Sequence, residues 1–449
     1  MKPPGPRGLD NLRYLRRLQG PQILDAVQDL WKSYGDTSVI SLPFGRSIYF
    51  IHDPADVMEI LVRQAKKFIK GKALETFKLL IGNGVAVSDK DIWVRQRRQV
   101  QPNFHHQSLG RYAPIIVQTA AEYRAVWLQH DGFQNFDRLL PQLTQAIIAR
   151  TLLGADLSRQ LSDLQSNWDE AMAFVVQRTN AMVRWPLMWP LPSHRRFARA
   201  RRLIRGSVAR LIEEQGDGGH SPDPNTLMNR MLRSHSTEIS QDELATQVLN
   251  VLFAGHETTG NGLSSALLFT LTHPEIHARI MSELEDVLAG EAPDYARLEK
   301  QVYLRQVVYE TLRLRSPVAL FLREAREDIQ LSACTLPQGA IVMLSPHILH
   351  RHPALWSDPD TFDPGRFNDP SACAPPKFLA FGAGGRTCVG DQYAIDTMML
   401  VLSGILQNLN LELDRSRPIQ ILCSNGTFKP HPLNIRVTAS SSRQSVDAH

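Results

Sequence analysis

Cys388 stands in a ten-residue segment, FGAGGRTCVG, whose composition suits the binding of a large flat group. Glycines let the backbone approach such a group closely and adopt positive φ angles. Arg386, two residues before the cysteine, adds a permanent positive charge. A cysteine thiolate is one of the few protein ligands that push electron density onto haem iron and favour O–O cleavage. The segment therefore predicts haem-thiolate ligation by Cys388.

Zinc or disulfide chemistry suits this cysteine less well. A structural zinc site needs four Cys or His ligands, often in a C-x₂₋₄-C spacing, and the sequence contains no C-x-x-C. Four cysteines in 449 residues are too sparse for a disulfide framework. We interpret Cys334, Cys373 and Cys423 as ordinary residues in a reducing compartment.

A second set of reactive side chains lies in AGHETT, residues 254–259. This segment is near the middle of an apolar helix predicted from Ser240 to Thr272, with a capping-box pattern at its start and Pro274 after its end. Such a helix is roughly 50 Å long and must run through the core. Gly, Glu and Thr are poor choices there, and we expect Gly255 to remove bulk where a ligand approaches.

Glu257 and Thr258 combine a carboxyl and an alcohol, the two groups that proton delivery to bound dioxygen requires. A threonine hydroxyl can also bond the carbonyl four residues earlier and bend the helix. Taken alone, the segment could instead be a kink with an exposed glutamate. We interpret His256 as a bystander rather than an iron ligand.

Both segments resemble motifs of the cytochrome P-450 family, namely the cysteine loop F-G-x-G-x-R-x-C-x-G and the oxygen-activation motif A/G-G-x-D/E-T-T/S. The resemblance implies that Cys388 is the axial ligand of haem b (iron protoporphyrin IX), with Thr258 as the alcohol and Glu257 as the acid. The chain also carries the family's E-x-x-R helix and its P-x-R-F segment. The resemblance gives their charged residues a structural role in holding the ligand loop: Glu310, Arg313 and Arg366.

Haem carries two propionates, which need cationic partners, and arginine suits them because its charge is permanent and its geometry bidentate. Trp93 and Arg97 match the family's W-x-x-x-R, and Arg323 follows an apolar strand expected over Val318–Leu322. The residues that the resemblance assigns to haem binding, besides Cys388, are Trp93, Arg97, Arg323, Arg386 and Phe381. Of these, Phe381 is expected to pack on the thiolate side of the ring.

The fold class is predicted as α+β, mainly α. Most of the chain from Trp93 to Leu312 has helical periodicity. Before this helical region, we expect a β-hairpin over Ser38–Ile51 and a short helix that begins at Asp53-Pro54. After it, we expect a helix from Val389 to Leu409 and four strands, at Ile329–Leu331, Ala340–Leu344, Leu411–Leu413 and Asn434–Val437. The resemblance implies a helix-rich cytochrome P-450 fold with a smaller β-rich region and a long central helix over the haem.

A chain of 449 residues is long enough for two or three domains, but no linker divides it. The flexible-looking stretches are Gln215–Asn225 and the tail from Ser440 to His449. We therefore expect a single domain over residues 1–449, with a core from about residue 20 to 438 and a flexible tail at 440–449.

The net charge of +5 is mild for this length and gives nucleic-acid binding little support. The arginine clusters near residues 95–98 and 195–205 are either solvated faces or a patch that steers an acidic electron-transfer partner. No apolar run of about 18 residues is present, so no transmembrane anchor is expected. Many eukaryotic members of the family carry such an anchor. The sequence therefore predicts a soluble, bacterial-type, cytoplasmic monomer.

The segments that line the substrate pocket in the family are rich in apolar residues here, which favours a lipophilic small molecule. They cover residues 68–85, 174–191, 318–322 and 423–428. A terpenoid, a fatty acid and a polyketide-like compound all remain open. We interpret Arg184–Pro192 as a lid over the haem, with contact to a lipid interface as the alternative.

The predicted activity is insertion of one oxygen atom from O₂ by hydroxylation or epoxidation, as in secondary metabolism. Electrons are expected from a separate ferredoxin or flavodoxin and its NAD(P)H-dependent reductase, because no flavin or iron–sulfur module fits in the chain. Two alternatives stay open. One is a haem-thiolate peroxygenase or isomerase that works without a reductase, and the other is a non-enzymatic haem-thiolate ligand-binding sensor.

Overall fold

The computed structural model describes residues 2–71, 74–155, 161–181, 185–216, 226–235, 240–424 and 427–440. Most of the predicted flexible stretch Gln215–Asn225 and of the tail after Ser440 lies outside the described residues, and so does Arg184 at the start of the expected lid. Within the described part, none of the helices is both long and apolar enough to cross a membrane.

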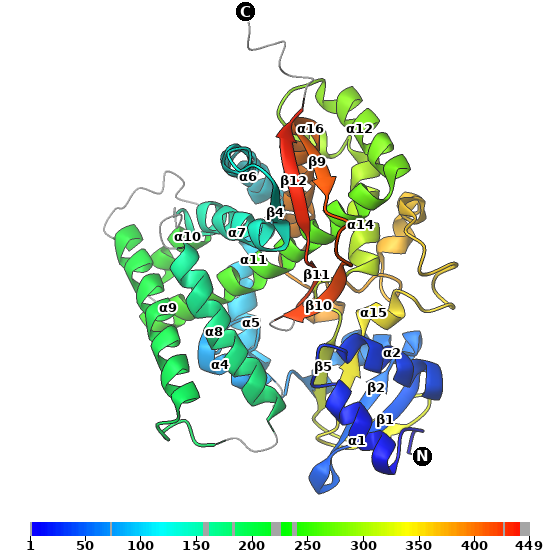
Figure 1. Ribbon diagram of the computed structural model, residues 1–449. Helices are drawn as coiled ribbons and strands as arrows, with labels where there is room; N and C mark the ends of the chain where they lie inside the picture. Colours follow the sequence, from blue (N-terminus) through cyan, green and yellow to red (C-terminus); the bar gives the residue numbers. More distant parts are fainter. Residues whose placement is uncertain are drawn as a thin grey trace, which may run out of the picture.

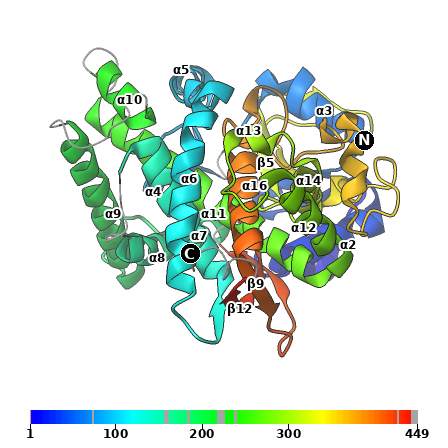
Figure 2. The same ribbon diagram turned by 90° about the horizontal axis from the view of Figure 1, so that it is seen from above.

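Helices make up most of the molecule, as Figures 1 and 2 show, which confirms the predicted mainly-α class. The α-helices are α1 (Gly8–Arg17), α2 (Ile23–Tyr34), α3 (Pro54–Met58), α4 (Glu75–Ile81), α5 (Lys90–Val100), α6 (His106–Trp127), α7 (Phe136–Ile148), α8 (Leu161–Asn180), α9 (Pro192–Gly216), α10 (Leu227–His235), α11 (Gln241–Thr272), α12 (Pro274–Leu288), α13 (Tyr295–Leu298), α14 (Val302–Leu314), α15 (Pro346–Leu349) and α16 (Asp391–Asn408).

The strands are β1 (Thr37–Ser41), β2 (Ser47–Ile51), β3 (Phe68–Ile69), β4 (Phe133–Asn135), β5 (Phe321–Ala325), β6 (Ile329–Gln330), β7 (Thr335–Leu336), β8 (Ile341–Leu344), β9 (Leu409–Leu413), β10 (Gln420–Ser424), β11 (Thr427–His431) and β12 (Asn434–Ala439). The largest sheet has the order β1-β2-β8-β5-β3 and lies beside α1 and α2. A second sheet, β4-β12-β9, and the hairpin β10–β11 lie on the other side of α15 in Figure 1.

The predicted hairpin over residues 38–51 is confirmed by the antiparallel pairing of β1 with β2. The strands predicted at Ile329–Leu331 and Ala340–Leu344 are confirmed as β6 and β8. They belong to different sheets, because β6 pairs with β7, whereas β8 joins the main sheet between β2 and β5. The short turn after Leu336 therefore leads from one small ribbon into a different sheet.

The long helix α11 is confirmed and runs for 32 residues through the centre of the fold. Ser240 caps it by accepting a hydrogen bond from the Glu243 backbone N–H at 3.2 Å. The Glu243 carboxylate pairs with Arg95 at 2.7 Å, so only half of the predicted capping box forms. Pro274 begins α12 immediately afterwards. Helices α7, α14 and α16 pack against α11, so its middle is held from several sides.

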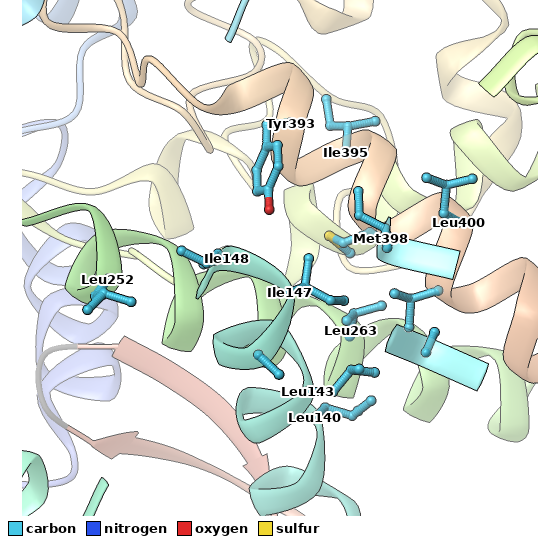
Figure 3. Packing of buried hydrophobic residues seen from close by; sticks show 14 of the residues in the cluster. Leu140, Leu143, Ile147, Ile148, Leu252, Leu263, Tyr393, Ile395, Met398 and Leu400 are labelled. Atoms are coloured by element: carbon cyan, nitrogen blue, oxygen red, sulfur yellow. The ribbon is translucent and has the colours of Figure 1, made fainter. Parts of the chain in front are cut away.

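The glycines of α11 allow close helix packing. A Cβ atom at Gly255 would lie 2.5 Å from Ile148 Cδ1, and one at Gly260 would lie 2.6 Å from Pro141 Cα, both on the α7 side. The expectation that Gly255 makes room for a ligand was therefore wrong, because its missing side chain makes room for α7 instead. Figure 3 shows the resulting core, in which α7, α11 and α16 meet: Leu140, Leu143, Ile147, Leu263 and Met398.

Candidate functional site

The cysteine loop forms a tight turn just before α16. The Cys388 backbone N–H donates to the Phe381 carbonyl at 2.9 Å, and the Thr387 hydroxyl donates to the Gly384 carbonyl at 2.8 Å. Gly382 and Gly384 adopt φ angles of +74° and +67°, which suit glycine far better than other residues. The loop thus closes on itself and presents the cysteine at the start of a buried helix.

Close packing against Leu61 is a second reason for a glycine at position 384. A Cβ atom there would lie 2.3 Å from the backbone oxygen of Leu61, a contact that real Cβ atoms do not make. Because Leu61 belongs to the π-helical turn Glu59–Arg63, the loop is pressed against a segment far away in the sequence. This close approach leaves no room for a side chain at position 384.

The Cys388 side chain is accessible in the protein alone, yet its surroundings are those of a buried group. Burial raises the pKa of the thiol to about 11, although the Gly390 N–H and the Arg97 charge lower it. The thiol therefore keeps an accessible surface, although protein surrounds it on most sides.

Positive charges gather beside this loop. Arg97 donates to the Thr387 carbonyl at 2.7 Å, and Arg386 donates to the Ser88 carbonyl and to Asp89, each at 2.7 Å. The Trp93 ring lies under both guanidinium groups, 4.1 Å from that of Arg386 and 5.6 Å from that of Arg97. The structure thus brings Trp93, Arg97 and Arg386 together beside the cysteine loop.

Arg323 joins the same cluster from β5, and Lys70 joins it from the segment after β3. Burial and the Arg386 charge lower the pKa of Arg323 to about 10 and that of Lys70 to about 7, and Asp89 only partly offsets the effect. Sequence reasoning missed Lys70 and Asp89. Their spacing from the motifs carries no signal, and only the folded chain brings them close.

The middle of α11 presents its acid and its alcohol in different directions. The Thr258 hydroxyl donates to the Ala254 carbonyl at 2.7 Å. Ala254 is exposed and Thr258 is partly exposed, so the side of α11 that carries them is accessible near the middle of the helix. The Glu257 side chain is 8% exposed, so the alternative of a kink with an exposed glutamate is wrong. Its Oε2 accepts a hydrogen bond from the Thr427 hydroxyl of β11 at 3.3 Å.

His256 faces away from that accessible side. Its Nδ1 lies 2.7 Å from the Leu252 carbonyl, and its ring packs edge-on against Trp168 of α8 at a centroid distance of 6.0 Å. The Thr144 hydroxyl of α7 donates to the His256 carbonyl at 2.7 Å. The side chain is 2% exposed and packs between helices, a position that fits the bystander role predicted for it.

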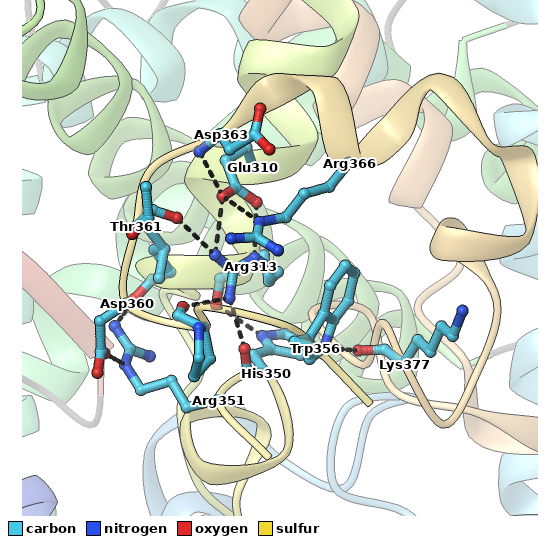
Figure 4. A network of polar contacts seen from close by, with 12 residues as sticks. Glu310, Arg313, His350, Arg351, Trp356, Asp360, Thr361, Asp363, Arg366 and Lys377 are labelled. Carbon is cyan, nitrogen blue, oxygen red and sulfur yellow. Dashed lines mark hydrogen bonds and ion pairs between the residues drawn. The ribbon is translucent and has the colours of Figure 1, made fainter. Parts of the chain in front are cut away.

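The three residues of the predicted structural network do meet (Figure 4). Arg313 binds Glu310 through two nitrogens at 2.6 and 2.8 Å, and both side chains are fully buried. Arg366 lies 3.4 Å from the same carboxylate, which also accepts the Asp363 backbone N–H at 2.8 Å. Burial raises the pKa of Glu310, and the Arg313 bonds counteract that effect.

Arg313 also reaches three backbone carbonyls, which belong to His350, Pro359 and Thr361, at 2.6, 2.7 and 3.1 Å. These carbonyls lie in the irregular chain between α15 and the cysteine loop. The guanidinium group therefore ties α14 to this loop region, a role that its bidentate fork suits and that a lysine could not fill.

The apolar segments expected to line a pocket differ in how exposed they are. Phe174 is buried and stacks on Phe197 of α9 at 4.5 Å, so it packs α8 against α9. The residues of 318–322 are partly accessible near β5, apart from the buried Ala319. In the expected lid, Trp185 and Trp189 stack on each other at 5.2 Å, and both are exposed, by 51% and 46%.

The residues described above fit haem b. The accessible Cys388 thiol is a side chain of the type that can ligate haem iron. Beside it stand four cationic side chains, those of Lys70, Arg97, Arg323 and Arg386. Their electrostatic partners include two carboxylates, Asp89 and Asp391. A group that brings two carboxylates would balance this excess of positive charge.

Comparison with known proteins agrees with this arrangement. Residues 3–438 match the family model described as cytochrome P-450. The chain is 30% identical over 387 residues to cyclooctatin synthase of Streptomyces melanosporofaciens, covering 83% of this chain and 82% of that protein. It is 28% identical to cyclooctat-9-en-7-ol 5-monooxygenase of the same organism, over 84% and 83% of the two chains. It is also 25% identical to pentalenene oxygenase of Streptomyces avermitilis, over 92% of each.

Proposed function

Because this chain belongs to the cytochrome P-450 family, we propose that it inserts one oxygen atom from O₂ into a cyclic terpenoid with electrons from a separate redox protein. The family consists of haem-thiolate enzymes, and the chain is accordingly a monooxygenase that binds haem b. The proposal depends above all on the acid–alcohol pair Glu257-Thr258, which lies in the middle of the long helix α11 beside an accessible face.

In this proposal, Cys388 holds the iron, and the cationic cluster beside the cysteine loop holds the two propionates. The residues assigned to that cluster are Trp93, Arg97, Arg323 and Arg386, with Lys70 as an addition. Phe381 anchors the loop through its carbonyl, which accepts the Cys388 N–H. When bound, haem supplies the iron at which O₂ is activated by two electrons.

The chain itself must supply protons, because the second oxygen atom leaves as water. Thr258 has its hydroxyl on the accessible face of α11. In this structure the hydroxyl donates its hydrogen to the Ala254 carbonyl, and a bound acceptor would compete for that hydrogen. Glu257 is the adjacent carboxylate, buried and held from β11. We assign Thr258 the role of orienting the proton that is delivered, and Glu257 the role of replacing that proton.

The terpenoid assignment comes from the relatives. Cyclooctat-9-en-7-ol 5-monooxygenase and pentalenene oxygenase are named for the compounds that they oxidise, and both match more than four-fifths of this chain. The partly accessible apolar residues near β5 suit a ligand of that kind. The cationic side chains near Cys388 bind the cysteine loop or are assigned to the haem propionates. They are therefore not available to bind an anionic substrate.

The electrons are assigned to a separate ferredoxin or flavodoxin with an NAD(P)H-dependent reductase. Residues 3–438 all match the family, which leaves no segment within them for a flavin or an iron–sulfur module. A peroxygenase takes its protons and electrons from H₂O₂ rather than from solvent and a reductase, so the intact acid–alcohol pair favours the reductase-dependent reaction.

The ligand assignment is tested by reducing the purified holoprotein under carbon monoxide. The wild type should absorb at the red-shifted position of thiolate ligation, and Cys388→His should lose that band while retaining haem. Cys373→Ser, which changes a cysteine outside the loop, is the control and should keep the band. A wild-type adduct without the red shift would overturn the assignment.

The substrate class is tested with pentalenene, cyclooctat-9-en-7-ol and dodecanoic acid. We expect the two terpenoids to displace the Soret band at lower concentration than the fatty acid, and to gain one oxygen atom in the presence of NADPH, ferredoxin and reductase. A parallel reaction with H₂O₂ alone should be much slower. Turnover that is faster with H₂O₂ alone would favour the peroxygenase, and preference for dodecanoic acid would refute the terpenoid assignment.

A further inference from the structure

Thr427, the first residue of β11, lies between two polar side chains of α11. Its hydroxyl donates to Glu257 Oε2 at 3.3 Å and accepts from Asn261 Nδ2 at 3.1 Å. All three side chains are buried, with exposed fractions of 7% for Thr427, 8% for Glu257 and 2% for Asn261. The contact joins segments 170 residues apart in the sequence.

These hydrogen bonds have a defined direction. A threonine hydroxyl has a single hydrogen, and an ionised carboxylate can only accept. Because Asn261 donates to Thr427, the threonine hydrogen is available for Glu257, and a charge-assisted bond of this kind is stronger than a neutral one. Thr258 cannot do the same for Glu257, since its own hydrogen is donated to the Ala254 carbonyl.

The strand that carries Thr427 is fixed on both sides. The backbone N–H of Phe428 donates to the Pro317 carbonyl at 2.9 Å. Further along β11, Lys429 and His431 bind the buried Asp137 carboxylate of α7 at 3.3 and 2.9 Å. A hydroxyl on such a strand has little freedom to move, so it can hold a flexible glutamate in one place.

We propose that Thr427, supported by Asn261, is the positioning residue of the Glu257 carboxylate in proton delivery. This rests on the role assigned to Glu257 in the proposed function. The hydroxyl helps to keep the carboxylate at one position in the interior, because a hydrogen bond to a fixed strand restricts a side chain with three rotatable bonds. The hairpin β10–β11 is therefore part of the proton-delivery apparatus, although it holds none of the groups that react.

The first test compares Thr427→Val, which removes the hydroxyl, with Thr427→Ser, which keeps it. The probe is pentalenene, with NADPH, ferredoxin and reductase. We expect the valine variant to form at least fivefold less product per NADPH and correspondingly more H₂O₂, and the serine variant to stay within twofold of wild type. Pentalenene affinity, measured by the Soret displacement, should change by less than twofold in both variants, because the substitution impairs proton delivery rather than substrate binding.

A second readout needs no turnover. Infrared difference spectra of the resting holoprotein, labelled with ¹³C-glutamate, identify the Glu257 carboxylate band as the one that Glu257→Gln removes. Thr427→Val should shift this band because the carboxylate loses a donor, and Thr427→Ser should restore it. If the valine variant lacks the thiolate-type carbon monoxide band and is therefore misfolded, Thr427→Ala replaces it in both experiments.

The outcomes separate this inference from the proposed function. If Glu257→Gln itself leaves the product yield per NADPH unchanged, the role assigned to Glu257 fails. If Glu257→Gln lowers the yield but Thr427→Val does not, the positioning role of Thr427 fails alone. An unmoved carboxylate band in Thr427→Val also overturns the inference, whatever the yield.

Discussion

Glu257 and Thr258 are adjacent in the sequence, but their side chains have different partners and different exposure. The hydroxyl of Thr258 bonds its own helix, whereas the carboxylate of Glu257 is held by a strand from the other end of the chain. Successive helical residues point about 100° apart, so one segment can offer an alcohol to the accessible face and keep its acid buried beside that face.

Replacement of Thr258 tests the alcohol. We expect Thr258→Ala to consume NADPH at a rate close to wild type while product falls by roughly tenfold to a hundredfold, because the proton is no longer oriented. The ratio of H₂O₂ to product, measured with pentalenene, reports the change. Thr258→Ser is the matched control and should recover most of the yield, whereas an alanine variant with an undiminished yield would remove Thr258 from the mechanism.

At the scale of elements, the cysteine loop depends on how it packs against distant segments. Gly384 touches the Leu61 carbonyl, and Arg313 bonds three carbonyls between α15 and the loop. The loop itself contains no regular strand and only a short 3₁₀ turn at Gly384–Arg386. Its geometry therefore depends on these distant contacts as well as on the hydrogen bonds within the loop.

A methyl group at Gly384 should displace the loop. We expect Gly384→Ala to lose most of its haem, because it combines a φ of +67° with a Cβ position 2.3 Å from the Leu61 oxygen. Gly45→Ala is a close control, since Gly45 has a φ of +72° but no atom within 4 Å of an added Cβ. It should cost only about 1–2 kcal/mol of backbone strain. Haem content and the carbon monoxide spectrum distinguish the two, and equal effects would mean that the contact with Leu61 is unimportant.

Removal of Arg313 should strongly destabilise the protein. Arg313→Met leaves the Glu310 carboxylate buried with Arg366 as its remaining cation at 3.4 Å, and we expect a loss of about 3–5 kcal/mol in urea unfolding. Arg313→Lys should recover little of this, because the fork is absent. The exposed pair Arg436–Glu412 provides the control, and Arg436→Met should cost about 0–1 kcal/mol. Similar losses at both positions would contradict the structural role.

At the scale of the whole molecule, buried histidines make the fold sensitive to acid. Burial lowers the pKa of His52 and of His350 to about 3, and neither ring nitrogen of His52 has a hydrogen-bond partner in the part of the chain that the structure describes. The ordinary pKa is 6.5. Between these values the unfolded chain binds more protons than the folded one, so stability is complete above about pH 6.5 and is lost as the pH falls toward 3.

Each such histidine should contribute about 1.4 kcal/mol of lost stability per pH unit in that window. We expect His52→Phe to flatten the dependence of the unfolding free energy on pH by about this amount between about pH 6 and 4. Urea unfolding at several pH values measures the slope. His130→Phe is the control, because His130 is exposed and keeps its contact with water on folding. An unchanged slope in His52→Phe would show that His52 is protonated in the folded protein.

Short-range features of the sequence were sufficient for much of the fold and of the site. The limits of α11 follow from Ser240 and Pro274, and the hairpin β1–β2 follows from alternation around a turn, because helix caps and turns depend on neighbouring residues. The same holds for Glu310 and Arg313, which are three residues apart and meet on one helix face. The motif around Cys388 is likewise a short-range feature, because all its residues lie within ten positions of the sequence.

Only the tertiary structure decided which distant segments meet. It placed Lys70 in the cationic cluster, turned Gly255 toward α7, joined β8 to β2, and put the Thr427 hydroxyl on Glu257. The physical reason is that contacts between distant segments depend on how all the helices and sheets pack together, whereas residue spacing specifies only what lies within a few turns of the chain. The sequence by itself therefore determined the reactive groups and the helices and turns that carry them, and packing decided their partners.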